Sequence, residues 1–258
     1  MNIKNVLIKI EYDGTNFSGW QKQPNARTVQ GEIEHVLRFI AGHDVNIHGT
    51  SRTDAGVHAL CQCATFEWDS AMPVDKLAMV MNRRLGTGGI GRCGAAGDIR
   101  ILSAEVVPEN FHARYSCIGK TYRYIIDKSA DIFERNKSWQ YPYASELDAQ
   151  AMRIASGYIV GTHDFKCFES SGGTPRETTV RTVRSLNIID EPNMIIIEIT
   201  GDGFLYNMVR IIVGTLVEVG LGKKSSDDMA DIIKKRDRSL AGFTAPPQGL
   251  YLKEIYFS

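Results

Sequence analysis

Strand-like and helix-like segments alternate along the whole chain, and this alternation most constrains how it can fold. The alternating run VLIKIEY at 6–12 is followed by apolar residues at helical spacing, which begin after Thr28 and end before Gly42. Similar segments recur up to a last strand-like run at 250–257, without any repeat of sequence. Adjacent strands in this order can pair directly. The pattern therefore predicts an α+β fold of two ferredoxin-like, split βαβ lobes, joined through an extended, mostly antiparallel sheet.

The length of 258 residues accommodates two such lobes. We expect the boundary near Pro108, with an N-terminal lobe of residues 1–108 and a C-terminal lobe of residues 109–258. Within the first lobe, six of the twelve residues from Gly86 to Gly97 are glycine, and nothing in the segment is periodic. It is predicted to be a flexible surface loop.

Local signals predict further elements in both halves. Residues 44–47 and 60–68 are apolar, strand-like runs, and residues 181–189 and 194–200 resemble the two strands of a hairpin. Ser145, with Asp148 three positions later, has the pattern of a helix N-cap with a capping box. Residues 161–165 are predicted to form a polar turn.

Composition excludes several classes of protein. Apolar residues make up 43% and charged residues 23% of the chain, as in an ordinary globular protein with a sizeable core. No apolar run approaches the length of a membrane-spanning helix, so no membrane association is expected. Five cysteines without disulfide-like spacing indicate a reducing, cytoplasmic location. The formal net charge is zero, which argues against an overall basic coat but permits a local basic cleft.

A dense polar cluster, GTSRTDAGVHA at 49–59, separates two of the strand-like runs. Asp54 precedes Gly56 by two residues, and from this local pattern alone an Asx-turn is favoured. Arg52 shares a face with Asp54 along an extended segment, and a nearby guanidinium keeps a carboxylate ionised and oriented. A carboxylate in that state can act as a nucleophile. The cluster contains no second acid, so a glycosidase-type carboxylate pair is not indicated.

Arg210 lies in a segment, 204–219, that is predicted to be a helix with apolar residues on most of its faces. An arginine in such a place is rare unless it is paired. Its aliphatic stem can carry the charge out to solvent. Alternatively, it enters a cleft and meets a carboxylate, for which Asp54 is the candidate.

Rings and cations alternate between Phe111 and Tyr124. Alone, this pattern favours a half-buried strand with its charged residues toward solvent. The functional alternative is a nucleic-acid surface, on which rings stack on bases and cations contact phosphates. Elsewhere, Cys61 and Cys63 are too closely spaced for a usual zinc site, and we expect both thiols to fill one buried face of a strand. No metal site is predicted.

Six motifs stand in order along the chain: YDGTNFSGWQ at 12–21, SRTDAGVHA at 51–59, FHAR with KTYRY at 111–124, GTHDF at 161–165, DGFLYNMVR at 202–210 and APPQGLYL at 245–252. They closely resemble the motifs of the TruA-type tRNA pseudouridine synthases. They are spread in order over roughly the whole length of the chain, which leaves little room for a chance match.

The resemblance implies the pseudouridine synthase fold and the isomerisation of uridine to pseudouridine at positions 38, 39 and 40, in the anticodon stem-loop of tRNA. It also implies a homodimer with tRNA lying across both subunits, and no metal or cofactor. By position, Asp54 corresponds to the catalytic aspartate and Tyr122 to the tyrosine that stacks on the target base. Arg52 corresponds to the arginine associated with flipping the nucleotide out, and Arg210 to the arginine that pairs with the aspartate.

Two departures from the family pattern stand out. Ser51 replaces the usual glycine, and it would be strained if that position required a positive φ. The glycine-rich loop with Cys93 replaces a shorter connection. Two other functions remain as alternatives: an RNA-binding protein without turnover, and a hydrolase of small nucleosides. The joint presence of Asp54, Tyr122 and Arg210 argues against the first, and the long aromatic and basic surface argues against the second.

Overall fold

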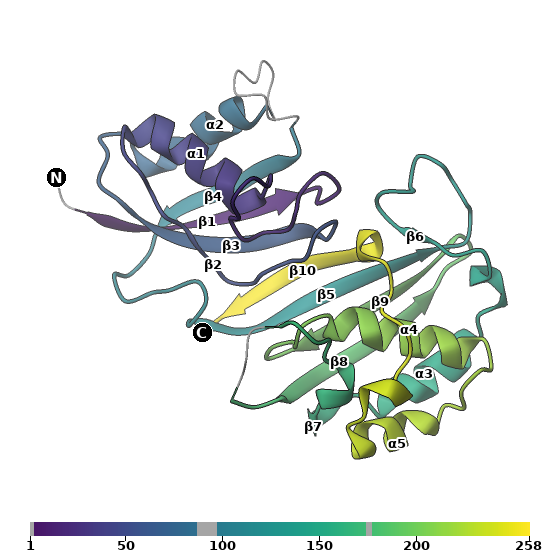
Figure 1. Ribbon diagram of the computed structural model, residues 1–258. Helices are drawn as coiled ribbons and strands as arrows, with labels where there is room; N and C mark the ends of the chain where they lie inside the picture. The colour runs from purple at the N-terminus through teal and green to yellow at the C-terminus, as the bar shows by residue number, and fades with distance from the viewer. Residues whose placement is uncertain (1–2, 87–96, 174–176) are drawn as a thin grey trace. The chain divides into compact units, whose positions relative to one another are not determined.

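A computed structural model describes residues 3–86, 97–173 and 177–258 (Figure 1). The chain divides into two compact units. Unit 1 consists of residues 1–118 and 251–258, and unit 2 of residues 119–250. The sequence placed the boundary at Pro108 and the whole C-terminal end in the second lobe. The difference arises because residues 109–118 and the last strand pack on unit 1, where the Ser258 amide donates to the Ser116 carbonyl and the Phe111 ring contacts Phe257.

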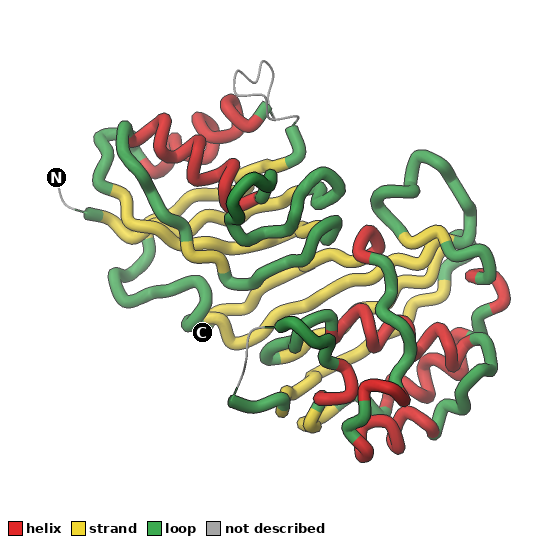
Figure 2. The backbone as a smooth tube through the Cα atoms, in the orientation of Figure 1, coloured by secondary structure: helices red, strands yellow, loops and turns green. Residues whose placement is uncertain are grey.

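Unit 1 is a sheet with two helices on one face (Figures 1 and 2). Strands β4, β1 and β3 lie side by side in this order and are antiparallel, and short β2 pairs with β3. Strand β10 runs parallel to β3, with Tyr251 opposite His58. The elements are β1 (Lys4–Tyr12), α1 (Val29–Ala41), β2 (His48–Gly49), β3 (His58–Trp68), α2 (Val74–Leu85), β4 (Ile99–Val106) and β10 (Leu250–Phe257).

Unit 2 also combines a sheet with helices (Figures 1 and 2). Strands β5, β9, β8 and β7 are antiparallel neighbours in this order, and β6 pairs with β5. The elements are β5 (Cys117–Asp127), β6 (Trp139–Gln140), α3 (Ala149–Gly157), β7 (Gly161–Asp164), β8 (Val180–Asp190), β9 (Met194–Gly201), α4 (Met208–Gly220) and α5 (Asp228–Lys235), with single 3₁₀ turns at 144–146, 166–168, 238–240 and 247–249. The predicted α+β class with mostly antiparallel pairing is confirmed.

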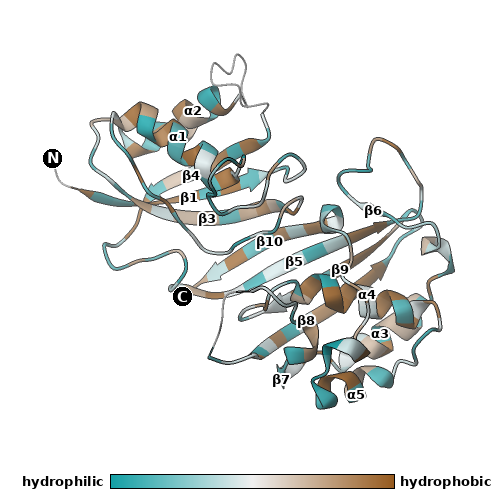
Figure 3. Cartoon of the chain, viewed as in Figure 1, coloured by the Kyte–Doolittle hydropathy of each residue, from teal (hydrophilic) through white to brown (hydrophobic). Residues whose placement is uncertain are grey.

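Each unit has its own apolar core, visible as brown stretches on its strands and helices (Figure 3). In unit 1, Trp20, Phe66 and Trp68 are among the largest side chains that are almost completely buried. In unit 2, Tyr124 and Phe165 have the same role. No described helix is long and apolar enough to cross a membrane.

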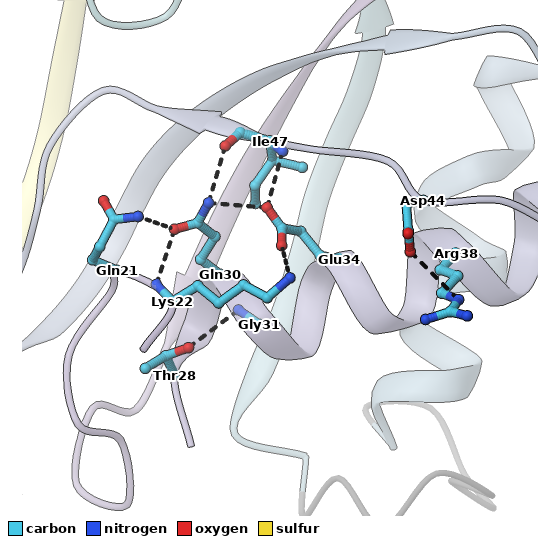
Figure 4. A network of polar contacts seen from close by, with 9 residues as sticks. All are labelled: Gln21, Lys22, Thr28, Gln30, Gly31, Glu34, Arg38, Asp44 and Ile47. Carbon is cyan, nitrogen blue, oxygen red and sulfur yellow. Dashed lines mark hydrogen bonds and ion pairs between the residues drawn. The ribbon is translucent and has the colours of Figure 1, made fainter. Parts of the chain in front are cut away.

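Helix α1 begins and ends as its sequence predicts. The Gly31 amide donates to the Thr28 hydroxyl at the N-cap, and Gly42 takes the left-handed conformation (φ 85°) just after the last turn. The buried Glu34 carboxylate accepts hydrogen bonds from the Gln30 side chain and the Ile47 amide and pairs with the Lys22 ammonium at 2.9 Å (Figure 4). This network fastens the segments before and after α1 to the helix.

Three local predictions were wrong. Residues 44–47 form no strand, because the Ile47 amide and carbonyl bond to side chains of α1 instead of a neighbouring strand. Asp148, and not Ser145, is the N-cap of α3, and its carboxylate accepts from the amides of residues 150 and 151. The predicted polar turn at 161–165 is largely the edge strand β7, paired with β8. Most of the predicted glycine-rich loop, including Cys93, lies outside the described residues.

Candidate active site

The polar cluster forms the loop that leads into β3. Thr53 is buried, whereas Arg52 before it is exposed and Asp54 after it is half-buried. The Val57 amide donates to the Asp54 carbonyl at 3.1 Å, and Gly56 has a φ of 76°. The chain therefore turns here through a main-chain hydrogen bond, with glycine supplying the expected positive φ, whereas the predicted Asx-turn through the Asp54 side chain stays a prediction.

Ser51 causes no backbone strain. The non-glycine residues with positive φ in the described chain are Asn25, Ala130, Asn207 and Arg236, so Ser51 is not one of them. Its carbonyl accepts a 2.7 Å hydrogen bond from the side chain of Gln62, which is fully buried. The replacement of the family glycine thus leaves the backbone of this loop in an ordinary, anchored conformation.

Backbone-to-backbone contacts lock this loop against residues 13–20. A Cβ atom on Gly14 would lie 2.0 Å from the Val57 carbonyl oxygen. The two backbone segments are therefore in contact at a point where only glycine fits. Gly19, with a φ of 93°, approaches the Thr53 carbonyl in a similar way. The same Thr53 carbonyl accepts a 3.0 Å hydrogen bond from the Trp20 amide. The residues on both sides of Asp54 are therefore fixed by a second segment of unit 1.

Side chains reinforce the lock. The hydroxyl groups of Tyr12 and Thr53 form a buried hydrogen bond of 2.7 Å. Nδ1 of His58, at the end of the loop, accepts from the Gly14 amide at 3.0 Å and lies 3.2 Å from an Asp13 oxygen. Both ends of the loop are thus attached to the motif at 12–21.

Arg210 lies in the first turn of α4, in unit 2, and is half-buried. Its Nε donates to the Ala245 carbonyl at 2.7 Å, and one Nη donates to the side-chain oxygen of Asn207 at 2.8 Å. These two acceptors fix the plane of the guanidinium. The oddity noted in the sequence, a charge in an apolar helix, corresponds to an arginine held by polar partners at the end of that helix.

Tyr122 lies on β5 in unit 2, opposite Ile199 of β9, and only 7% of it is exposed. The Phe204 ring packs edge-to-face against it, with centroids 5.2 Å apart and planes at 89°. Phe204 belongs to the motif that carries Arg210, so unit 2 brings the central motif and the 202–210 motif into contact.

The predicted site residues therefore come in two pairs. Arg52 and Asp54 share one loop of unit 1, and Tyr122 and Arg210 belong to unit 2. Their assembly into one site remains a prediction. Sequence reasoning missed the residues that hold the Asp54 loop, above all Gly14, which lies inside the motif at 12–21. A glycine after a strand and before an aromatic-rich loop was the available signal.

The Cys61–Cys63 pair agrees with its prediction in part. The two thiols lie on one face of β3, where they are hydrogen-bonded to each other, but only Cys63 is buried and Cys61 is half-buried. A hydrogen bond from Cys63 lowers the pKa of Cys61 to about 7, and Lys9 contributes in the same direction. Among the described residues, no group of three or more His, Cys, Asp or Glu side chains is arranged to hold a metal ion.

Comparisons with known proteins agree on one family. A family model described as tRNA pseudouridine synthase matches residues 8–116 and 155–258. The chain is 45% identical over 257 residues to tRNA pseudouridine synthase A 2 of Clostridium tetani, with 99% of each chain covered. It is 46% identical over 255 residues to tRNA pseudouridine synthase A of Acetivibrio thermocellus, covering 99% of this chain and 100% of the relative. A solved Cbf5-Nop10-Gar1 complex aligns with a TM-score of only 0.36 at 10% identity, over 83% of this chain and 54% of that one.

Proposed function

Because this chain belongs to the tRNA pseudouridine synthase family and is thus an isomerase acting on tRNA, we propose that it modifies uridines 38, 39 and 40 of the anticodon stem-loop, with Asp54 as the catalytic nucleophile. The six ordered motifs support this assignment of the target region, and the motif at 51–59 supports the assignment of the nucleophile.

The observation that carries the proposal is the lock around Asp54. A half-buried carboxylate follows the buried Thr53, whose carbonyl and hydroxyl are both bonded to residues of the motif at 12–21. Such restraint fixes the backbone that carries the Asp54 side chain and so reduces the cost of positioning the carboxylate during the reaction. In a loop that served only to bind phosphates, a carboxylate would weaken binding, because its negative charge repels the phosphates.

The reaction is an isomerisation, so uridine and its product have the same atoms, and it requires an oriented carboxylate. The N1–C1′ bond of uridine breaks, the uracil rotates, and a C5–C1′ bond forms; C5 loses a proton and N1 gains one. Asp54 can attack C1′ of the ribose, attack C6 of the uracil, or assist the departure of uracil. Each of these routes requires an ionised and oriented carboxylate.

The other site residues have complementary roles in the proposal. Unstacking the target nucleotide costs a few kcal/mol. Arg52, exposed beside Asp54, fills the space that the nucleotide leaves, and Tyr122 stacks on the flipped base, which is worth roughly 1–3 kcal/mol. Arg210 pairs with Asp54 and keeps it charged. The protein acts in the cytoplasm as a homodimer, without metal or cofactor, and tRNA lies across both subunits, as the family resemblance implies.

The decisive experiment compares Asp54→Asn with the wild type on unmodified tRNA transcripts. We expect the variant to form no pseudouridine while it binds tRNA within a small factor of the wild-type affinity, since the side chain keeps its size but loses its charge and with it its nucleophilicity. Site-by-site mapping on wild-type products should find pseudouridine at positions 38, 39 and 40.

Asp75→Asn is the matched control, because Asp75 is exposed in the first turn of α2 and should leave turnover unchanged. Turnover by Asp54→Asn would refute the nucleophile assignment. Modification confined to other positions would refute the assignment of the target region.

A further inference from the structure

Asn207 has an unusual backbone at the start of α4. It is the N-cap of this helix, with φ 59° and ψ 8°, in the left-handed region that non-glycine residues seldom occupy. An N-cap asparagine usually has an extended backbone and accepts from an amide of the first turn. Here no amide of the helix bonds to its side chain. The capping position is thus used for another purpose.

The Asn207 side chain bridges two other residues. Its oxygen accepts from Nη1 of Arg210 at 2.8 Å, and its Nδ2 donates to the Ser170 hydroxyl at 3.1 Å. Ser170 is itself anchored, because its amide donates to the Tyr206 carbonyl at 3.1 Å. If the amide were flipped, its NH₂ would face the guanidinium, and two donors would oppose each other. The bond to Ser170 therefore helps to keep the oxygen directed at Arg210.

The second acceptor of Arg210 is equally well fixed. Ala245 accepts from Nε of Arg210, and its own amide donates to the Arg210 carbonyl at 3.1 Å. Close by, a Cβ on Gly214 would lie 1.9 Å from the Phe243 carbonyl, so α4 and this segment are packed backbone to backbone. The guanidinium is thus held at two edges by acceptors that cannot easily move.

We propose that Asn207 is a positioning residue for the reaction: it orients the guanidinium of Arg210, and its left-handed backbone is what places its side-chain oxygen there. This inference rests on the proposed role of Arg210. It extends that role to a residue that contacts neither the reacting base nor Asp54 in the proposed mechanism. The strained backbone then has a function, because strain of this kind tends to persist where the surrounding structure needs it.

The test is Asn207→Gly. Glycine adopts a φ near 59° without strain, so the backbone should persist while both side-chain hydrogen bonds are lost. Single-turnover rates with enzyme in excess should fall about tenfold to a hundredfold, as expected for a slightly misplaced catalytic group. The affinity for tRNA should stay within about twofold. The midpoint of thermal unfolding should fall only slightly, by the amount expected for two lost side-chain hydrogen bonds and a more flexible unfolded chain, partly offset by the relief of backbone strain. Asn25→Gly is the matched control: Asn25 has a φ of 58° and is exposed, so its rate should not change.

The same substitution in an Arg210→Ala background isolates the mechanism. If Asn207 acts through Arg210, the second change should cause no further loss of rate. Three results would each overturn the inference: a near-wild-type rate for Asn207→Gly, the same fold loss in the Arg210→Ala background, or a rate loss matched by a large fall in thermal stability. If Arg210→Ala alone is fully active, the proposed role of Arg210 fails as well. If only Asn207→Gly is active, Arg210 keeps its role and the positioning inference alone fails.

Discussion

Gly14→Ala tests whether the lock between residues 13–20 and the Asp54 loop controls catalysis. The added Cβ would lie 2.0 Å from the Val57 carbonyl oxygen and 2.5 Å from its carbon. Atoms of this kind attract at roughly 3.5 Å, so one of the two backbones must retreat by more than about 1 Å. Gly14 does not have a positive φ, and the effect therefore comes from this contact alone. A displacement of about 1 Å can cost roughly a hundredfold in rate, and overpacking of a tight site costs about 1–3 kcal/mol of stability.

The assay follows the C5 proton. With tRNA made from uridine tritiated at C5, tritium is released as the C5–C1′ bond forms, and a single-turnover experiment gives the rate of that step. Gly14→Ala should be about a hundredfold slower, with its urea midpoint lowered. Gly157→Ala is the control. A Cβ there meets nothing within 4 Å, and alanine in a helix should raise stability by about 0.5–1 kcal/mol without changing the rate. A Gly14→Ala enzyme with wild-type rate and stability would refute the proposed lock.

Two further predictions concern unit 1. Glu34→Ala should lower the free energy of unfolding by about 2–4 kcal/mol, because it leaves the buried Ile47 amide without its acceptor. Glu34→Gln keeps a side-chain oxygen as acceptor and should cost about 1 kcal/mol. Urea unfolding that ranks the two variants in the opposite order would contradict this. Alkylation of Cys61, followed by peptide mass spectrometry, should have a pH midpoint of about 7. Cys63→Ala should move that midpoint up toward an ordinary thiol value, since the bond from Cys63 is the largest cause of the low pKa, and an unmoved midpoint would assign the effect to another group.

The sequence predicted those elements whose signals are local. Helix α1 was bounded by Thr28 and Gly42 because a cap and a left-handed glycine act on adjacent residues. The hairpin of β8 and β9 followed from two alternating runs around a polar turn. Residues 44–47 were assigned wrongly because their backbone partners are side chains of α1, and no periodicity within a segment reveals which distant groups will satisfy it.

The candidate site divides in the same way. Asp54 was visible as a carboxylate in a polar cluster, and Arg210 as a charge in an apolar helix. Asn207 was not visible, because its left-handed backbone and its bond to Ser170 exist only after distant segments have packed. Gly14 was visible only as one residue of the motif at 12–21. Its contact with Val57 arises because two distant backbone segments approach closely, and this approach is set by the fold as a whole.

The pairing of β10 with β3 has a consequence for how the protein is made. Tyr251 lies opposite His58, and the connection between these parallel strands includes α2, β4 and the whole of unit 2. On a ribosome, the strand that completes the sheet of unit 1 emerges only after all of unit 2 has been synthesised. The end of the Asp54 loop therefore waits with an uncovered strand edge while all of unit 2 is synthesised. Nascent chains stalled before residue 250 should be prone to aggregation and easily cleaved by proteases, and the Asp54 loop should gain its protection only when synthesis has passed residue 257.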